Sequence, residues 1–173
     1  LIIGEFKGFL RHLENSRKNE RLLVFNYQDR TSWQDFGRSD VIERYQRDAE
    51  ISSVLYVITL PKKTDFYLQS EAYLPQDDAK DFIELLVSQI KDSVNCGFFF
   101  SSKLDLKVIL DFSKKCSSLV LKHFFGNKKR LSRKNRLDFI EVFYQFLQLK
   151  IVDLVDPSII AFMGKDSVDY AST

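Results

Sequence analysis

The sequence predicts an α+β fold with a small, mainly antiparallel sheet, N-terminal and central helices, and a C-terminal antiparallel helical hairpin. Before residue 102, short apolar blocks typical of strands mix with helical patterns, and after it two long helical patterns follow without strand signals. The sequence has no glycine-rich turn after its first predicted strand, which disfavours a doubly wound parallel sheet. We expect one domain over 1–173, with an α/β portion (1–101), a helical hairpin portion (102–164) and a frayed tail (165–173).

Hydrophobic spacing predicts the elements of the first portion. Apolar residues three and four positions apart predict a helix over 2–13, and the brief apolar block 22–27 predicts a buried strand. Asp40 and Glu43 have the reciprocal capping pattern, which predicts a short helix near 40–48. This part of the chain therefore reads as helix, strand, helix.

The centre of the chain is the source of the predicted antiparallel pairing. Residues 51–60 are β-branched and aromatic, 61–64 suit a turn, and 66–74 alternate apolar and polar residues, so together they predict a hairpin. A single apolar stripe over 79–94 predicts a helix, and 98–100 predict a third short strand.

Two long helices are expected after Ser101. The first spans about 102–125 and is closed by Gly126, and the second spans about 132–155. We expect them to pack antiparallel, followed by one packed turn at 158–163.

Composition excludes several classes of protein. The chain is 45% hydrophobic with 16 Phe, which rules out disorder for most of its length, and the net charge of +2 gives no strong overall field toward nucleic acid or membrane. No run approaches the roughly 20 apolar residues that cross a bilayer. Two cysteines, Cys96 and Cys116, do not make a disulfide scaffold and predict an intracellular protein, cytoplasmic or nuclear. The start at Leu1 predicts a piece of a longer chain.

Motifs for cofactors, metals and nucleophiles are missing from the sequence. Its six glycines form neither a GxGxxG nor a P-loop pattern, and no Cys/His spacing indicates a zinc site, so we expect no cofactor and no metal. Cys116 and His123 lie two turns apart on one helix, roughly 10 Å in rise, which is too far for a nucleophile–base pair. We interpret Cys116 as a small buried hydrophobe.

One local feature stands above this background, a run of six cations in nine residues. Removing them from the net charge leaves the rest of the chain at −4, and the run straddles a helix start, where the dipole disfavours positive charge. It is interpreted either as a solvated turn or as a site for an anion, whether nucleic acid, an acidic protein or a lipid headgroup. The predicted binding residues are Lys128, Lys129, Arg130, Arg133, Lys134 and Arg136.

The last helix is apolar on most of its faces, so it must be buried on most of them. The preceding helix and the sheet explain this burial if the helix is central to the core. The alternative is that a second chain covers part of it, with interface candidates Phe139, Val142, Phe146 and Leu149.

Residues 28–50 mix charges of both signs around the single tryptophan. Trp33 with Arg30 and Arg38 predicts either a loop anchor or a recognition patch. The carboxylates there are interpreted mainly as ion-paired surface.

We therefore expect a non-enzymatic protein–protein interaction module, acting as a domain or subunit of a larger intracellular assembly or by self-association, with a basic turn at 128–136 that faces an anion. The alternative is a nucleic-acid-binding domain that uses that turn. A second alternative is an enzyme with a site in 28–50 that depends on Asp35, Asp40 or His12.

Overall fold

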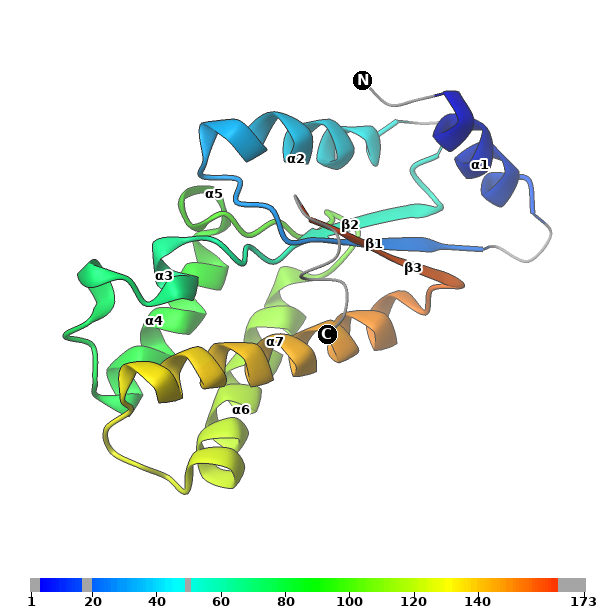
Figure 1. Cartoon of the computed structure of the whole chain (residues 1–173). Helices are drawn as coiled ribbons and strands as arrows, with labels where there is room; N and C mark the ends of the chain where they lie inside the picture. The colour runs from blue at the N-terminus through cyan, green and yellow to red at the C-terminus, as the bar shows by residue number, and fades with distance from the viewer. Residues whose placement is uncertain (1–3, 17–19, 49–50, 165–173) are drawn as a thin grey trace.

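The computed structural model describes residues 4–16, 20–48 and 51–164, and its centre is a small sheet (Figure 1). Three strands pair in the order β2-β1-β3, and both pairings are parallel. In register, Val24 pairs with Val57 on one side and with Ala161 on the other. The strands are β1 (Leu22–Asn26), β2 (Leu55–Thr59) and β3 (Ile159–Met163).

The prediction of a mainly antiparallel sheet is therefore wrong. All five residues of β1 are buried, because both faces of the sheet carry helices, and continuous apolar strands of this kind are typical of parallel sheets. The expected hairpin over 51–74 does not form. Its second half is helical instead, because the Thr64 side chain accepts a hydrogen bond from the Tyr67 N–H and caps a short helix. The chain there forms α3 (Asp65–Leu68) and the 3₁₀ turn η1 (Glu71–Tyr73).

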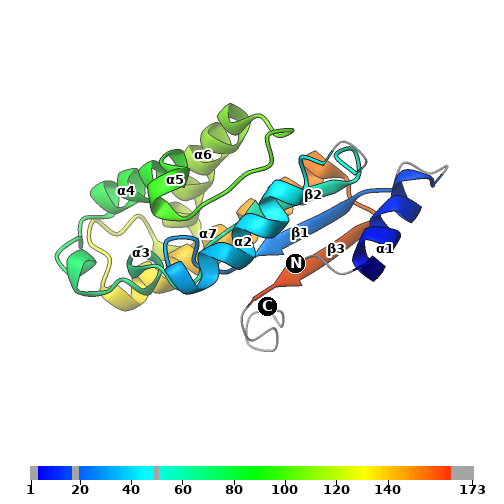
Figure 2. The same cartoon turned by 90° about the horizontal axis from the view of Figure 1, so that it is seen from above.

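Helices α1 (Gly4–Glu14) and α2 (Trp33–Tyr45) cover one face of the sheet (Figure 2). Leu10, Leu13 and Ile42 of these helices pack with the residues of β1 and β2 that point to that face. Because α2 joins β1 to its parallel neighbour β2, it makes the crossover that a parallel pair needs. The helix predicted near 40–48 is thus the end of a longer one, which begins after the cap Ser32.

The opposite face is covered by a thicker helical layer. Helix α7 (Arg133–Val155) lies against this face, and α4 (Ala79–Lys91) and α6 (Leu106–Phe125) pack outside it (Figures 1 and 2). The side chains of Phe82, Phe139 and Phe143 from this layer are fully buried. The last helix is therefore a core helix, as one of the two interpretations of its sequence expected.

The predicted antiparallel helical hairpin is also not what the structure shows. The end of α6 and both limits of α7 agree with the prediction, since Gly126 ends α6 in a left-handed conformation and Ser132 caps the start of α7. Helix α6 begins at Leu106 rather than near residue 102, because Asp105 caps it. The two helices, however, cross at a wide angle (Figure 1), since α7 follows the sheet while α6 also packs on α4. Consecutive helices with a short link can be antiparallel, but here the two packing partners of α6 set its direction.

Three smaller expectations also changed. Residues 98–100 contribute only one isolated antiparallel bridge, between Phe99 and Thr59, and a short helix α5 (Ser93–Cys96) precedes them. The packed turn expected at 158–163 is instead the strand β3 (Ile159–Met163), so the portion expected to be a helical hairpin contributes to the sheet. The expected tail at 165–173 lies outside the described residues.

Candidate functional site

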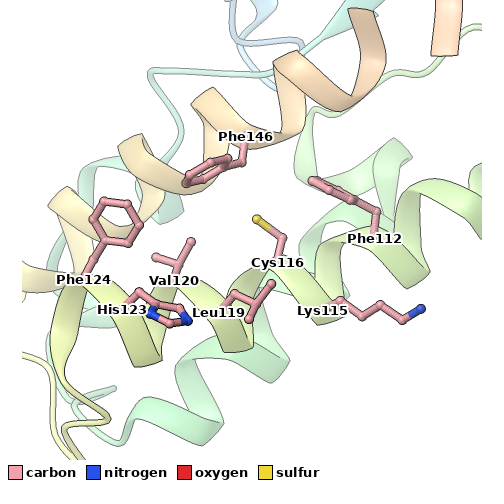
Figure 3. Close-up of a pocket in the computed structure, with 8 residues that line it drawn as sticks. All are labelled: Phe112, Lys115, Cys116, Leu119, Val120, His123, Phe124 and Phe146. Carbon is pink, nitrogen blue, oxygen red and sulfur yellow. The ribbon is translucent and has the colours of Figure 1, made fainter. Parts of the chain in front are cut away.

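An apolar groove of about 510 Å³ lies between α6 and α7 (Figure 3). Most of its walls come from α6, and Phe146 faces them from α7. The lining residues are Phe112, Lys115, Cys116, Leu119, Val120, His123, Phe124 and Phe146.

The groove forms because α6 and α7 cross at a wide angle. Cys116 and Val120 lie on the side of α6 that packs into the core, so they form the floor and are buried. Leu119 and Phe124 lie off that stripe and are 56% and 57% exposed. At one end the ring of Phe124 meets the ring of Phe146 edge to face, with centroids 6.0 Å apart. Large exposed apolar side chains gathered on one concave surface are typical of interaction sites.

The thiol in the groove belongs to Cys116. Burial raises the pKa of this thiol to about 11, so we expect little thiolate at neutral pH. This agrees with the interpretation of Cys116 as a small hydrophobe. Among the described residues both cysteines are free, and no group of three His, Cys, Asp or Glu side chains is placed to hold a metal ion.

The stretch of chain that forms most of the groove and the turn after it carries only positive charges. No Asp or Glu occurs between Asp111 and Asp138, while this stretch contains nine Lys and Arg residues. Lys115 lines the groove itself, and Phe124 at its end comes just before the basic turn. Any acidic ligand of the groove would therefore meet cations on this side.

The structure separates the six cations of the basic turn into two groups. Arg136 is 1% exposed and donates hydrogen bonds to the Gln69 Oε1 (2.6 Å) and to the Leu131 carbonyl (2.8 Å), with longer ones to the carbonyls of residues 73 and 74. Arg133 donates to the carbonyl oxygens of residues 68 and 69. These two arginines tie the start of α7 to the α3–η1 segment.

The remaining four cations face solvent. Arg130 is exposed and lies 3.6 Å from an oxygen of Asp77, a distance that gives little stabilisation at an exposed site. Lys128, Lys129 and Lys134 are exposed and make no ion pair with another described residue. If the basic turn binds an anion, these four side chains are the ones that can reach it.

The interface candidates on α7 also fall into two groups. Phe139 is fully buried in the core and Val142 is partly buried, whereas Phe146 lines the groove and Leu149 is 64% exposed. The outer side of α7 is therefore the part that a partner can contact.

On α2, Trp33 is 85% exposed, which excludes the interpretation of this residue as a loop anchor. Arg38 is exposed as well. Arg30 has a different environment, because its guanidinium lies 2.9 Å from an oxygen of the buried Glu43 and donates to the Phe98 carbonyl. The three candidates therefore do not form one surface.

Residues 28–50 contribute to a buried polar network at the carboxyl ends of β1 and β2. The Asn26 side chain donates to the hydroxyls of Ser39 (2.9 Å) and Thr59 (3.2 Å), and Thr59 donates to Glu43 (2.7 Å). Burial raises the pKa of Glu43, against the opposing effects of Thr59 and Arg30. The network links α2 to the strand ends, and its members satisfy one another.

The candidate catalytic residues of that segment lie apart from this network or at its edge. Asp40 forms an exposed ion pair with Arg44 (2.7 Å), and Asp35 is buried in the first turn of α2. The third candidate, His12, lies outside residues 28–50 and is exposed on α1. The ion-paired surface expected here is present at Asp40, whereas the pair of Glu43 is buried.

Sequence reasoning missed the groove as a site. The sequence predicts that the helix over about 102–125 covers the last helix, and it predicts no ligand-binding surface on that helix. A signal was present, because Leu119 and Phe124 are large apolar residues off the stripe that Ile109, Cys116 and Val120 define.

Comparisons with protein-family models, with curated proteins and with solved structures found no match to this chain. Within the described residues, no helix combines the length and apolar character needed to cross a membrane.

Proposed function

We propose that this chain is a non-enzymatic protein-interaction module whose α6/α7 groove binds an amphipathic partner segment with acidic residues beside its apolar face. The observation that carries the proposal is the combination of an apolar groove with a lining cation, Lys115, on a stretch of chain that carries no carboxylate between Asp111 and Asp138. The exposed Leu119 and Phe124 offer contacts for apolar anchors, and Lys115 and the adjoining turn offer contacts for carboxylates.

A helix or short extended segment suits the groove better than a small molecule. The lining side chains come from two helices (Figure 3), and Phe124 at one end comes just before the basic turn in the chain. A segment can therefore lie along the groove with its apolar side on the lining and its charged side outward. Free cysteines, one of them buried, agree with a reducing compartment, and we propose that the partner belongs to the same intracellular assembly.

Nucleic acid is the second candidate function. The exposed side chains of Lys128, Lys129, Arg130 and Lys134 support it, since phosphate contacts need only accessible cations. The apolar groove favours the protein segment, because its lining offers aliphatic and aromatic contacts outside the basic turn, whereas the turn itself contains no aromatic side chain on which a base could stack.

Fluorescence anisotropy with a defined probe tests the proposal. The probe is a labelled helical peptide of about 16 residues, with Leu and Phe on one face and Glu on the other. Burial of three apolar anchors favours binding by about 2 kcal/mol each, and the cost of association and of ordering the peptide offsets part of this, so we expect a Kd of about 100 μM. A second peptide with Lys in place of Glu is expected to bind at least about tenfold more weakly.

Matched variants decide where the peptide binds. Phe124→Asp places a charge in the groove and should weaken binding about tenfold or more, whereas Phe36→Asp changes a similarly exposed phenylalanine on α2 and should leave the Kd unchanged. An equal Kd for both variants refutes the groove as the site. Salt-sensitive binding of oligonucleotides that is lost on changing the four exposed cations to Gln would favour the nucleic-acid function instead.

A further inference from the structure

We infer that a second cavity, beside β2, binds a small anionic ligand that joins a carboxylate or phosphate to an apolar body. This cavity measures about 380 Å³ and is separate from the α6/α7 groove in all its lining residues. It is lined by Arg30, Arg47, Phe99, Phe100, Ser101, Ser102, Leu104 and Leu106.

Three parts of the chain form the cavity. Arg30 follows β1, Arg47 follows the end of α2, and the segment from Phe99 to Leu106 leads into α6. Phe99 exchanges backbone hydrogen bonds with Thr59 (2.8 and 3.1 Å), which fixes the start of that segment beside the end of β2. Farther along, the Lys103 ammonium donates to the Leu55 carbonyl, so the segment stays along the strand. The cavity walls are thus fixed by the sheet.

The lining chemistry points to an anion. It contains two guanidinium groups and two hydroxyls but no carboxylate. Two contacts hold Arg30 in place. One of its N–H groups donates a hydrogen bond to the Phe98 carbonyl, and the centre of its guanidinium lies 5.4 Å from the centroid of the Phe99 ring. Arg47 is exposed and makes no ion pair with another described residue. The guanidinium fork matches the planar or tetrahedral oxygens of carboxylate and phosphate.

One buried polar atom without a partner lies at the same place. Among the described residues, the hydroxyl of Ser101 is one of four buried side-chain nitrogen and oxygen atoms that lack a hydrogen-bond partner. The Nε of Arg30 is another of the four, but it lies 2.9 Å from a carboxylate oxygen of Glu43 and so has an ion-pair partner. Ser101 is 1% exposed and its hydroxyl is unpaired. Buried groups left unpaired in this way are costly unless a ligand or rearrangement satisfies them.

The other half of the lining selects the body of the ligand. Phe99, Phe100, Leu104 and Leu106 present aromatic and aliphatic surface, and the volume is near the lower end of the range for small-molecule sites. A bare inorganic anion would leave this surface uncovered. An aryl or alkyl group attached to the anion fills it.

The ligand is unidentified, so the test uses four simple probes: phenyl phosphate, phenylacetate, benzyl alcohol and inorganic phosphate. Amide chemical shifts of the isotope-labelled full chain are followed by NMR during each titration. Saturable shifts of Ser101, Ser102 and Leu104 with a Kd of about 1 mM or tighter are expected for phenyl phosphate or phenylacetate, and the tighter of the two identifies the anionic group.

Controls separate the charge from the apolar contact. Benzyl alcohol and inorganic phosphate should each bind at least about fivefold more weakly, and equal binding of either probe overturns the inference. Arg47→Gln should weaken the aromatic anion about fivefold or more, while Arg38→Gln, an exposed arginine of α2 outside the lining, should not. Equal affinities for the two variants, or shifts that do not saturate, also overturn it.

Discussion

Replacing Arg136 by Met distinguishes cations that hold the fold together from cations that are free to bind. The substitution retains most of the length of the stem but removes the guanidinium. Two short hydrogen bonds are lost, to Gln69 and to the Leu131 carbonyl, and both acceptors remain in a buried site. Each acceptor left unsatisfied costs about 1 to 3 kcal/mol. Removing the guanidinium also removes the cost of burying its charge, which offsets part of this loss. The expected decrease in the free energy of unfolding is about 3 kcal/mol.

Urea unfolding followed by circular dichroism measures this loss. With an m-value of about 2 kcal/mol/M, the midpoint should fall by about 1.5 M. The control Lys134→Met removes an exposed cation two residues away and should change stability by no more than about 0.5 kcal/mol. Should Arg136→Met fail to fold, Arg136→Lys, which keeps one charged donor, is expected to lose about half as much. A loss below about 1 kcal/mol for Arg136→Met refutes the structural role.

Three further predictions concern a carboxyl group, a thiol and a glycine. Burial raises the pKa of the Glu43 carboxyl group above its ordinary 4.5, so the folded state binds the carboxyl proton more tightly than the unfolded state does. The free energy of unfolding of the wild type, relative to Glu43→Gln, should therefore fall as pH rises above about 4.5. Chemical denaturation at several pH values measures this difference. Cys116 should react with iodoacetamide at pH 8 roughly two orders of magnitude more slowly than a free cysteine, judged from its thiolate fraction; a rate like that of the unfolded chain contradicts the burial. Gly97→Ala should lower the free energy of unfolding by about 1 to 2 kcal/mol, because the φ of Gly97 is +80°. Gly37 lies in a helix with open space where a Cβ would be, so Gly37→Ala should raise the free energy of unfolding by about 0.5 to 1 kcal/mol. Equal effects of the two substitutions on Tm would contradict this.

Helix limits were predictable because their signals are local. The caps Asp105 and Ser132 and the stop at Gly126 act within one turn of the chain, so the limits of α6 and α7 follow from a few residues each. Direction of strand pairing is not local, because β1 finds β2 across a helix and β3 across most of the chain. The clue to the parallel sheet was the unbroken apolar run of β1, which leaves no polar face for solvent.

The alternation over 66–74 shows how a period-two pattern can mislead. In a strand, Phe66 and Leu68 would point to the same face of the sheet. In the structure Phe66 is buried and Leu68 is exposed, because helical geometry turns residues two apart to different sides. Thr64 begins the short helix and Gln69 ends it in a left-handed conformation, and these two ends outweigh the pattern between them.

The candidate site was predictable only in part. Arg136 shares its helical face with the buried Phe139, Ile140 and Phe143, a spacing that would have separated it from the exposed Lys134. The groove depends on the angle between α6 and α7, which arises from packing against α4 and the sheet and has no local signature.

The most direct test of the proposed interaction is an NMR titration of the labelled full chain with the acidic amphipathic peptide. The groove predicts that the largest amide shifts map to Lys115, Leu119, His123 and Phe124 on α6 and to Phe146 on α7, with smaller ones in the basic turn. Shifts confined to the exposed face of α2, or no saturable shifts at peptide concentrations of about 1 mM, would contradict the claim that the groove is an interaction site.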